Sequence, residues 1–231
     1  MNLKDKVVAI TGAYKGLGAA LSEAFANKGC RLVLGGRNEE ELEKFSAAMK
    51  KLTDVVSVII DVRKKEDNEQ FVKATIDKFG RLDILINNAG VWWKRKIDDV
   101  TEEDAATMFE TNTFGPLWCT KAALEVMKRQ DEGCIINIGS VVAVDHKSSH
   151  LLYAASKSAL LSFTGCLAEN LKNSNIRMVC FCPGGMKTNL FRHNPERFDP
   201  NFMDTKDVAD YLIKFIESDS KDWLVVLRRF E

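Results

Sequence analysis

The sequence has no excess of charge of either sign and few histidines. Its 231 residues carry 33 lysines and arginines against 33 aspartates and glutamates, so the formal net charge is +0. A balanced charge gives the chain no overall attraction to nucleic acid or to anionic lipid. The three histidines show no spacing typical of a metal site. We therefore expect no metal, no nucleic-acid partner and no membrane partner.

The sequence also lacks a C-x-x-C pair, and most of its cysteines lie in apolar runs. This pattern favours reduced, buried thiols over a disulfide framework. Cys180 and Cys182 alternate on one predicted strand, so we expect them to share a face and to pack in the core. The cysteines are Cys30, Cys119, Cys134, Cys166, Cys180 and Cys182.

No apolar stretch is expected to be long enough for a signal peptide or a membrane span. The first ten residues instead enter a strand-like run almost at once. These two features make the cytoplasm the expected location of the protein.

Short runs rich in β-branched residues alternate with amphipathic helical stretches. The predicted strands are Lys6–Ile10, Arg31–Leu34, Val55–Ile60, Leu82–Asn87, Cys134–Gly139, Ile176–Phe181 and Trp223–Leu227. The predicted helices are Leu17–Lys28, Glu39–Lys51, Asn68–Phe79, a long region Thr101–Gln130, Tyr153–Asn173 and Lys206–Glu217. Such alternation predicts an α/β fold with a doubly wound parallel sheet and helices on both faces. Without an internal repeat or a Pro/Gly-rich linker, residues 1–231 are expected to form a single domain.

Three glycines lie between the first predicted strand and the first predicted helix, where a phosphate-binding turn is found in dinucleotide sites. Gly12 allows a sharp exit from the strand, Gly16 lets the backbone approach a phosphate, and Gly18 lets the helix pack closely. The helix start then offers free N–H groups to a pyrophosphate. A glycine turn alone also occurs for purely steric reasons, so it does not establish a nucleotide site.

A second group of residues indicates proton transfer. Tyr153 and Lys157 are four residues apart on a predicted helix and should share one face. An ammonium beside a tyrosine stabilises the phenolate, so we expect Lys157, helped by the positive charge of an oxidised nicotinamide, to lower the pKa of Tyr153 from its ordinary value near 10. Ser140 follows a predicted strand at the ligand-binding edge of the sheet, where its hydroxyl can donate to a carbonyl oxygen.

The glycine spacing G-x-x-x-G-x-G, the segment Asn87-Asn-Ala-Gly90 and the set Ser140, Tyr153 and Lys157 together resemble the short-chain dehydrogenase/reductase family. The resemblance covers nearly the whole chain and implies a Rossmann-like fold. It also implies cofactor contacts from Gly12, Tyr14, Lys15, Gly16, Leu17, Gly18, Arg37, Asp61, Val62, Asn88, Ala89, Gly90, Tyr153, Lys157, Pro183, Gly184, Met186 and Thr188.

The resemblance gives each catalytic residue a role. Asn112 matches the family's active-site asparagine and would continue a proton route from Lys157 to water. Lys157 would also hold the hydroxyls of the nicotinamide ribose. The expected reaction is hydride transfer between a nicotinamide and a carbonyl or alcohol, with Tyr153 as proton donor or acceptor and Ser140 steadying the oxygen. A family member that performs epimerisation or dehydration, and a non-catalytic regulatory protein that keeps the nucleotide fold, are the alternatives.

Charge near the second predicted strand favours NADP(H) over NAD(H). An NAD site usually has a carboxylate after this strand to accept from the ribose 2′-hydroxyl. Here the strand ends at Arg37, no carboxylate follows before Glu39, and Lys15 adds a second cation. Two cations suit a 2′-phosphate. Alternatively, Arg37 is a solvated loop residue.

Three loops should form the pocket for a small carbonyl or alcohol substrate, at about residues 91–98, 141–152 and 185–203. Their apolar and aromatic side chains fit an apolar or aromatic substrate, although such residues also pack against one another. His146 and His150 are expected on the surface. The family's glycine-containing segment after the last strand is absent, so a homodimer through the helices at 101–129 and 153–173 is favoured over a homotetramer.

Overall fold

The structure, a computed structural model, describes residues 1–145, 150–188, 190 and 199–230. Its core is a seven-stranded sheet in the order β3-β2-β1-β4-β5-β6-β7, with every pair parallel. The strands are β1 Val7–Thr11, β2 Arg31–Gly36, β3 Val55–Ile59, β4 Ile84–Asn87, β5 Gly133–Ile138, β6 Ile176–Pro183 and β7 Leu224–Leu227. The predicted doubly wound parallel sheet is confirmed, and each strand lies within two residues of its predicted bounds.

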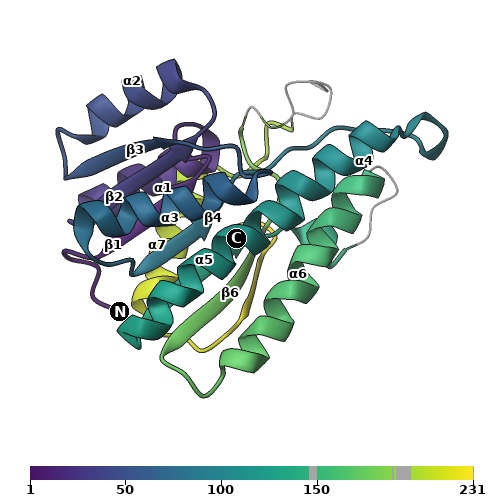
Figure 1. Cartoon of the computed structure of the whole chain (residues 1–231). Helices are drawn as coiled ribbons and strands as arrows, with labels where there is room; N and C mark the ends of the chain where they lie inside the picture. The colour runs from purple at the N-terminus through teal and green to yellow at the C-terminus, as the bar shows by residue number, and fades with distance from the viewer. Residues whose placement is uncertain (146–149, 189, 191–198, 231) are drawn as a thin grey trace.

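Helices cover both faces of the sheet. The α-helices are α1 Gly16–Asn27, α2 Glu39–Met49, α3 Lys65–Phe79, α4 Glu102–Phe109, α5 Gly115–Gln130, α6 Leu151–Leu171 and α7 Thr205–Glu217. One apolar core joins the sheet to α1, α2 and α7, and a second joins it to α3, α5 and α6. Figure 1 shows α5 and α6 side by side on the near face, with α4 continuing beyond the sheet. Burial of β1, β4 and β5 between the two layers explains why their sequences are almost continuously apolar.

The connection from β6 to β7 differs in hand from those before it. β4, β5 and β6 follow one another across the sheet, and the helices that connect them pack on one face. The step to β7 goes in the same direction, but α7 packs beside α1 on the opposite face. Crossovers that have the same hand and move in the same direction across a sheet place their helices on the same face. Because α7 lies on the opposite face, the β6–α7–β7 crossover has the opposite hand.

The predicted long helical region at Thr101–Gln130 is confirmed, but it is not one regular α-helix. α4 is followed by a π-helical segment, Glu110–Phe114 (η2), before α5 begins. Thr101 caps α4 through a capping box with Asp104, so the start of the helix was visible in the sequence. The π segment places Asn112 in the interior with 0% exposure. Such bulges are frequently found at functional sites.

One expectation about apolar segments needs correction. By length and composition, α6 could cross a membrane, contrary to the expectation that no such stretch exists; 28% of its membrane-length window is buried. It nevertheless packs on β6 and carries Tyr153 and Lys157 toward the interior. Cys166, on the same helix, is exposed, whereas the other five cysteines are buried. The expected shared face of Cys180 and Cys182 is confirmed, because their sulfurs are 3.6 Å apart.

Candidate active site

The main cavity of the described structure, about 540 Å³ in volume, lies at the carboxyl edge of the sheet. The strand order reverses between β1 and β4, which is where open α/β sheets bind ligands. Asn88 ties the two strand ends together, because its side-chain amide donates to the carbonyls of Thr11 and Gly12 at 3.0 Å each. Thr11 Oγ1 in turn accepts from the amides of Asn88 and Ala89 at 3.1 Å.

Most of the predicted site residues line this cavity. They are Gly12, Lys15, Gly16, Leu17, Arg37, Asn88, Ala89, Gly90, Ser140, Tyr153, Lys157, Pro183, Gly184, Met186 and Thr188. Thr107, Ile138 and Gly139 also line it and were missed by the sequence analysis. Ile138 and Gly139 directly precede Ser140, so their position at the same strand end was the available signal. Thr107 carried no such signal, because its position depends on the packing of α4.

Five predicted residues lie outside the cavity lining. Tyr14 packs on Gly36, where a Cβ would lie 2.2 Å from its ring. Gly18 faces the glycine turn, and a Cβ there would lie 2.0 Å from the Gly12 carbonyl oxygen. Asp61 and Val62 follow β3, and Asn112 lies in the π segment.

The glycine turn has the geometry that a phosphate cradle requires. Gly12 and Gly16 adopt positive φ angles of 63° and 55°, which favour glycine. α1 begins after Lys15 without a side-chain cap among the described residues and without an acidic residue in its first turn. Its first N–H groups and the positive end of its dipole are therefore left for an anion. Across the cavity, the Thr188 side chain would lie 3.3 Å from a Cβ at Gly16, so no larger side chain fits between them.

Two cations stand at the end of the cavity formed by β2 and α1. Arg37 is exposed, and Lys15 has a half-exposed side chain that stacks over Tyr14 at 5.0 Å. Their acidic neighbours are already engaged. Glu41 lies 3.9 Å from Lys15, and Asp61 forms a bidentate pair with Arg63 at 3.0 and 2.6 Å. Hydrogen bonds from Arg63, aided by the charge of Arg37, hold the pKa of Asp61 below its usual value.

Ser140, Tyr153 and Lys157 converge at the centre of the cavity. Tyr153 is 9% exposed and Lys157 4%, one turn apart on α6. Lys157 Nζ donates to the Ile138 carbonyl at 2.7 Å and lies 5.9 Å from the centre of the Tyr153 ring. Ser140 leaves β5 in an extended conformation, its hydroxyl accepts from the Val142 amide at 3.4 Å, and it lies near enough to the Tyr153 phenol to act on the pKa of that phenol. The side chains that the sequence predicted to act together are thus in one place.

In the protein alone, the pKa of Tyr153 is raised rather than lowered; the expected lowering by Lys157 together with a bound nicotinamide stays a prediction. Burial raises the pKa of Tyr153 to about 12, and the hydrogen bond with Ser140 only partly offsets this. Burial also lowers the pKa of Lys157 to about 8. The ammonium is directed to the Ile138 carbonyl rather than to the phenol, so desolvation decides both shifts.

Asn112 holds the backbone beside the catalytic group. Its side-chain oxygen accepts from the Val91 amide and its nitrogen donates to the Val91 carbonyl, both at 2.9 Å. The same nitrogen contacts Ser156 Oγ at 3.1 Å. A Cβ on Gly90 would lie 3.3 Å from Asn112 Oδ1 and 3.8 Å from Lys157 Nζ. Asn112 therefore fixes the start of the first substrate loop against the helix that carries Lys157.

An apolar cluster surrounds Tyr153 on the side away from the glycine turn. It consists of Trp92, Met108, Val142 and Tyr153, with Trp93 and Leu190 packed against them. His150 is half-buried and lines the cavity, contrary to the expected surface position. Its ring lies 5.6 Å from that of Trp92 and 6.3 Å from that of Tyr153. The predicted loop residues His146, Phe191 and Phe198 lie outside the described residues.

The cavity fits a dinucleotide. The positive-φ glycines and the uncapped start of α1 form a cradle that any Cβ would fill, and this cradle opens into the same space as the buried tyrosine. The residues that would hold such a group are those of the glycine turn, Asn88 to Gly90, Lys157 and the loop from Pro183 to Thr188. A parallel sheet in this order with this cradle defines a Rossmann-like nucleotide-binding protein.

Comparison with known proteins narrows this class. The short chain dehydrogenase family model matches residues 6–198. An uncharacterised oxidoreductase of Staphylococcus saprophyticus is 34% identical over 222 residues, covering 95% of this chain and 94% of the relative. The chain therefore belongs to the short-chain dehydrogenase family of oxidoreductases.

Two solved structures show the same architecture. L-sorbose reductase from Gluconobacter frateurii, complexed with NADPH and L-sorbose, superposes with a TM-score of 0.86 at 25% identity and covers 99% of this chain and 98% of its own. A short-chain dehydrogenase/reductase from Burkholderia phymatum, in complex with NAD, has a TM-score of 0.91 at 24% identity and covers 97% and 90%. Their shared fold confirms the predicted Rossmann-like class.

Proposed function

We propose that the protein is an NADP(H)-dependent oxidoreductase that interconverts a carbonyl compound and its alcohol. The observation that carries the proposal is the convergence of Ser140, Tyr153 and Lys157 in one cavity with the glycine turn. A nucleotide-binding regulatory protein would have no use for a buried tyrosine–lysine pair, because burying such groups is costly. When bound, a nicotinamide dinucleotide supplies the hydride.

The chain's own residues would manage the proton. With a pKa near 12, Tyr153 is protonated at neutral pH and can donate its phenolic proton to a carbonyl oxygen. Ser140, which lines the same cavity, can donate to the same oxygen as charge develops on it. Lys157 holds a positive charge behind them, and Asn112 fixes the backbone at Val91. The apolar cluster around Trp92 excludes water from this side.

The function is tested with a panel of ketones and aldehydes in the presence of NADPH, following the loss of nicotinamide absorbance. Tyr153→Phe should lower kcat at least about 100-fold, because it removes the proton donor, and should leave NADPH affinity within about threefold. Tyr211→Phe, at a 37% exposed tyrosine on α7, is the matched control and should keep full activity.

Near-normal turnover by Tyr153→Phe would refute the role of the phenol. Cofactor binding without reduction of any carbonyl compound would favour a regulatory protein. Epimerisation or dehydration of a substrate without net oxidation would instead indicate a family member that catalyses one of those reactions.

The preference for NADP(H) over NAD(H) rests on Lys15 and Arg37. Both line the cavity; Asp61 is paired with Arg63, whereas Glu41 lies 3.9 Å from Lys15 and offsets part of its charge, so Arg37 is the cation that chiefly supports the preference. One structural neighbour contains NADPH and another NAD, so the family alone does not decide the preference. A 2′-phosphate would gain charge-assisted hydrogen bonds from either cation.

Arg37→Ala should weaken NADPH binding about 10-fold or more and leave NADH binding nearly unchanged, because a hydrogen bond between charged groups contributes about 1.5–3 kcal/mol. Fluorescence titration with both reduced cofactors measures this. Lys44→Ala, an exposed lysine on α2, is the control. Tighter binding of NADH than NADPH by the unmodified protein would contradict the preference.

We also propose that residues 1–231 act as one domain in the cytoplasm. Five buried free thiols suit a reducing compartment. The apolar helix α6, of whose membrane-length window 28% is buried, supports a homodimer through α5 and α6, or a homotetramer that contains it.

A further inference from the structure

Two consecutive arginines follow β7, and each reaches a different substrate loop. Arg228 Nε donates to Asp145 Oδ2 at 3.1 Å, and its terminal nitrogen donates to Oδ1 at 2.9 Å. This is a bidentate pair, the strongest geometry for a guanidinium and a carboxylate. A terminal nitrogen of Arg229 lies 3.8 Å from Asp199 Oδ2, within ion-pair distance. Asp145 belongs to the loop after β5, and Asp199 to the loop after β6.

The Asp145 contact is transmitted to the catalytic serine by a short backbone path. The Asp145 amide donates to the Val141 carbonyl at 2.7 Å, and the Ala143 amide donates to the Ser140 carbonyl at 3.0 Å. Residues 140–145 therefore form one hydrogen-bonded turn. Val141 and Val142 in this turn line the main cavity beside Tyr153. Arg228 holds the far end of the turn whose near end is Ser140.

The Asp199 contact organises the other wall. Asp199 Oδ1 accepts from the Asn201 amide at 2.8 Å, and its carbonyl accepts from the Phe202 amide at 2.9 Å. The resulting turn places the Phe202 ring on Gly185, where a Cβ would lie 2.3 Å from the ring. Phe202 lines the main cavity. Asp199 thus joins the arginine to an aromatic wall residue.

The backbone that carries the arginines is itself anchored to the cavity. The Gly184 amide donates to the Leu227 carbonyl at 2.8 Å, and a Cβ at Gly184 would lie 2.4 Å from the Arg228 carbonyl oxygen. A second cavity, about 390 Å³ in volume, lies between both arginines and both loops. It shares Val141, Gly184, Gly185 and Phe202 with the main cavity. These four residues form a common wall between the cavity beside the two arginines and the main cavity.

We propose that Arg228 and Arg229 form a C-terminal clasp that positions the loops after β5 and β6 and thereby sets the affinity for substrate, an inference that rests on the proposed carbonyl reductase function. The arginine side chains are 60% and 67% exposed, so they contribute little to global stability. Loops of low local stability respond to small energies that the whole fold does not register. In the described part of the chain, the arginine side chains pair with Asp145 and Asp199, and Gly184 of the cofactor loop meets the backbone of Leu227 and Arg228. Substitution of an arginine side chain should therefore leave cofactor binding unchanged.

Charge reversal tests the clasp. Arg228→Glu should raise the KM for the carbonyl substrate about fivefold, equivalent to about 1 kcal/mol, with kcat within about twofold. Asp145→Arg should do the same, and the double variant should return KM to within about twofold of the starting value. Arg228→Lys keeps the charge but loses the bidentate geometry, so its KM should lie between those of the unmodified protein and of Arg228→Glu. Lys73→Glu on α3, which removes an ion pair far from both loops, is the control.

A second readout is independent of turnover. In Arg228→Glu, hydrogen exchange should accelerate at the amides of residues 143–145 and stay unchanged in β1 and α1, while NADPH affinity is retained. If the unmodified protein reduces no carbonyl compound, the proposed function fails and the exchange experiment still decides the clasp. Unchanged KM and exchange, a double variant that does not recover, or a parallel loss of NADPH affinity and melting temperature would each overturn the clasp.

Discussion

Lys157 places a cation where the fold removes nearly all of its contact with water. Its side chain is 4% exposed, and in the described structure its ammonium donates to the Ile138 carbonyl. Burial therefore lowers the pKa of Lys157 from 10.5 to about 8. A shift of this size corresponds to roughly 3 kcal/mol of penalty on the charged form. The proposed catalytic function is thus obtained at the expense of folding stability.

We predict that Lys157→Met stabilises the folded protein by about 1–3 kcal/mol at pH 7 while abolishing turnover. The folded pKa of Lys157 is lower than the unfolded one, so the unfolded chain binds more protons between pH 8 and 10.5. The stability linked to this lysine is therefore present above pH 10.5 and is lost as the pH falls through 8. The advantage of Lys157→Met should shrink accordingly toward pH 10.5.

Urea unfolding at several pH values between 7 and 10.5 measures this difference. Lys73→Met, at a 63% exposed lysine, should change stability by less than about 0.5 kcal/mol at every pH. A Lys157→Met protein that is less stable at pH 7, or whose difference does not vary with pH, would contradict the prediction.

The same residues show what the sequence can and cannot reveal. Tyr153 and Lys157 were predicted to share a face because helix periodicity alone requires it. The direction of the Tyr153 pKa shift in the protein alone could not be predicted, because it depends on how deeply the phenol is buried and on the Ile138 carbonyl that receives the ammonium. Neither depth of burial nor a backbone partner is visible in local sequence.

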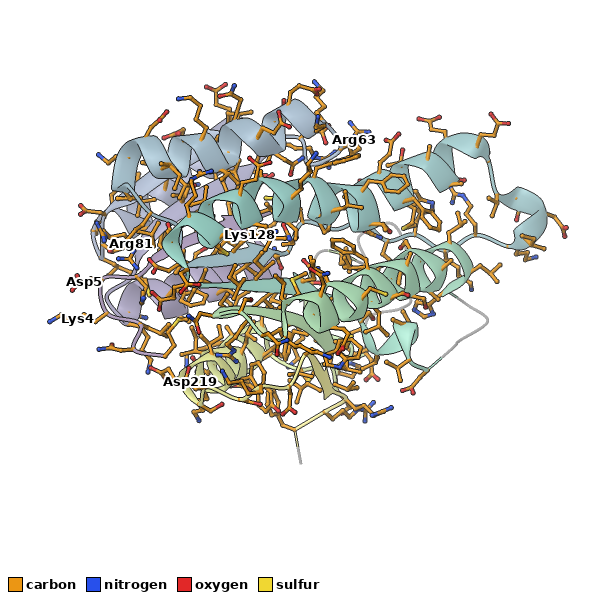
Figure 2. The ribbon with its side chains drawn as sticks, turned by 60° about the horizontal axis from the view of Figure 1, so that its bottom comes forward. Lys4, Asp5, Arg63, Arg81, Lys128 and Asp219 are labelled. Atoms are coloured by element: carbon orange, nitrogen blue, oxygen red, sulfur yellow. The ribbon has the colours of Figure 1, made fainter. Side chains whose placement is uncertain are left out.

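At the scale of elements, a buried carboxylate holds the amino-terminal edge of the sheet together. Asp83 is 1% exposed and accepts hydrogen bonds from Lys6, Arg81 and the Val7 amide. Burial acts to raise the pKa of Asp83, but the hydrogen bonds from Arg81, Val7 and Lys6 outweigh it and lower the pKa. Figure 2 shows Arg81 on the same side of the molecule as Lys4 and Asp5, away from α4. The cluster connects the starts of β1 and β4 at the edge opposite the cavity.

We predict that Asp83→Asn destabilises the fold by about 2–4 kcal/mol at pH 7, because it leaves two cations without their buried partner. The folded pKa of Asp83 lies below its unfolded value, so its stabilisation is present above about pH 4 and is lost as the pH falls further. In urea unfolding, the difference in the free energy of unfolding between Asp83→Asn and the unmodified protein should therefore be smaller at pH 3.5 than at pH 7.

Glu132→Gln is the matched control, since Glu132 also pairs with Lys6 but is 45% exposed. Glu132→Gln should lower the free energy of unfolding by less than about 1 kcal/mol. NADPH affinity should be unchanged in both variants because the cluster lies at the opposite edge. An Asp83→Asn protein as stable as the Glu132→Gln protein would contradict the prediction.

The order of elements could be predicted from the sequence, but two of their geometric details could not. Apolar runs such as Leu82–Asn87 located the strands, because strands covered on both faces must be apolar throughout. The π segment at Glu110–Phe114 escaped prediction, because its sequence continues the helical pattern of α4 and α5. The hand of the β6–α7–β7 crossover escaped it too, because an amphipathic helix such as α7 fits either face of the sheet.

At the scale of the whole molecule, α6 is the helix whose apolar surface the contacts within one chain explain least. It is apolar enough to cross a membrane, yet 28% of its apolar window is buried. α5 lies beside it on the same face (Figure 1). Large exposed apolar patches mark interaction sites, and a second copy related by a twofold axis would cover α5 and α6 with the same helices.

We predict that Ser162→Arg, at an exposed position midway along α6, converts a dimer into a monomer. A guanidinium placed in an apolar twofold interface meets its own copy, so both charges lose water without gaining a partner. Sedimentation velocity at micromolar concentration should show the unmodified chain at twice its 25.9 kDa mass or a multiple of that, and the variant at the mass of one chain. Lys44→Glu on α2, outside this face, should leave the association unchanged. A monomeric unmodified protein, or a Ser162→Arg variant that associates as before, would show that α6 is not covered by a second copy; in the second case the interface must lie on another face, such as that of α7.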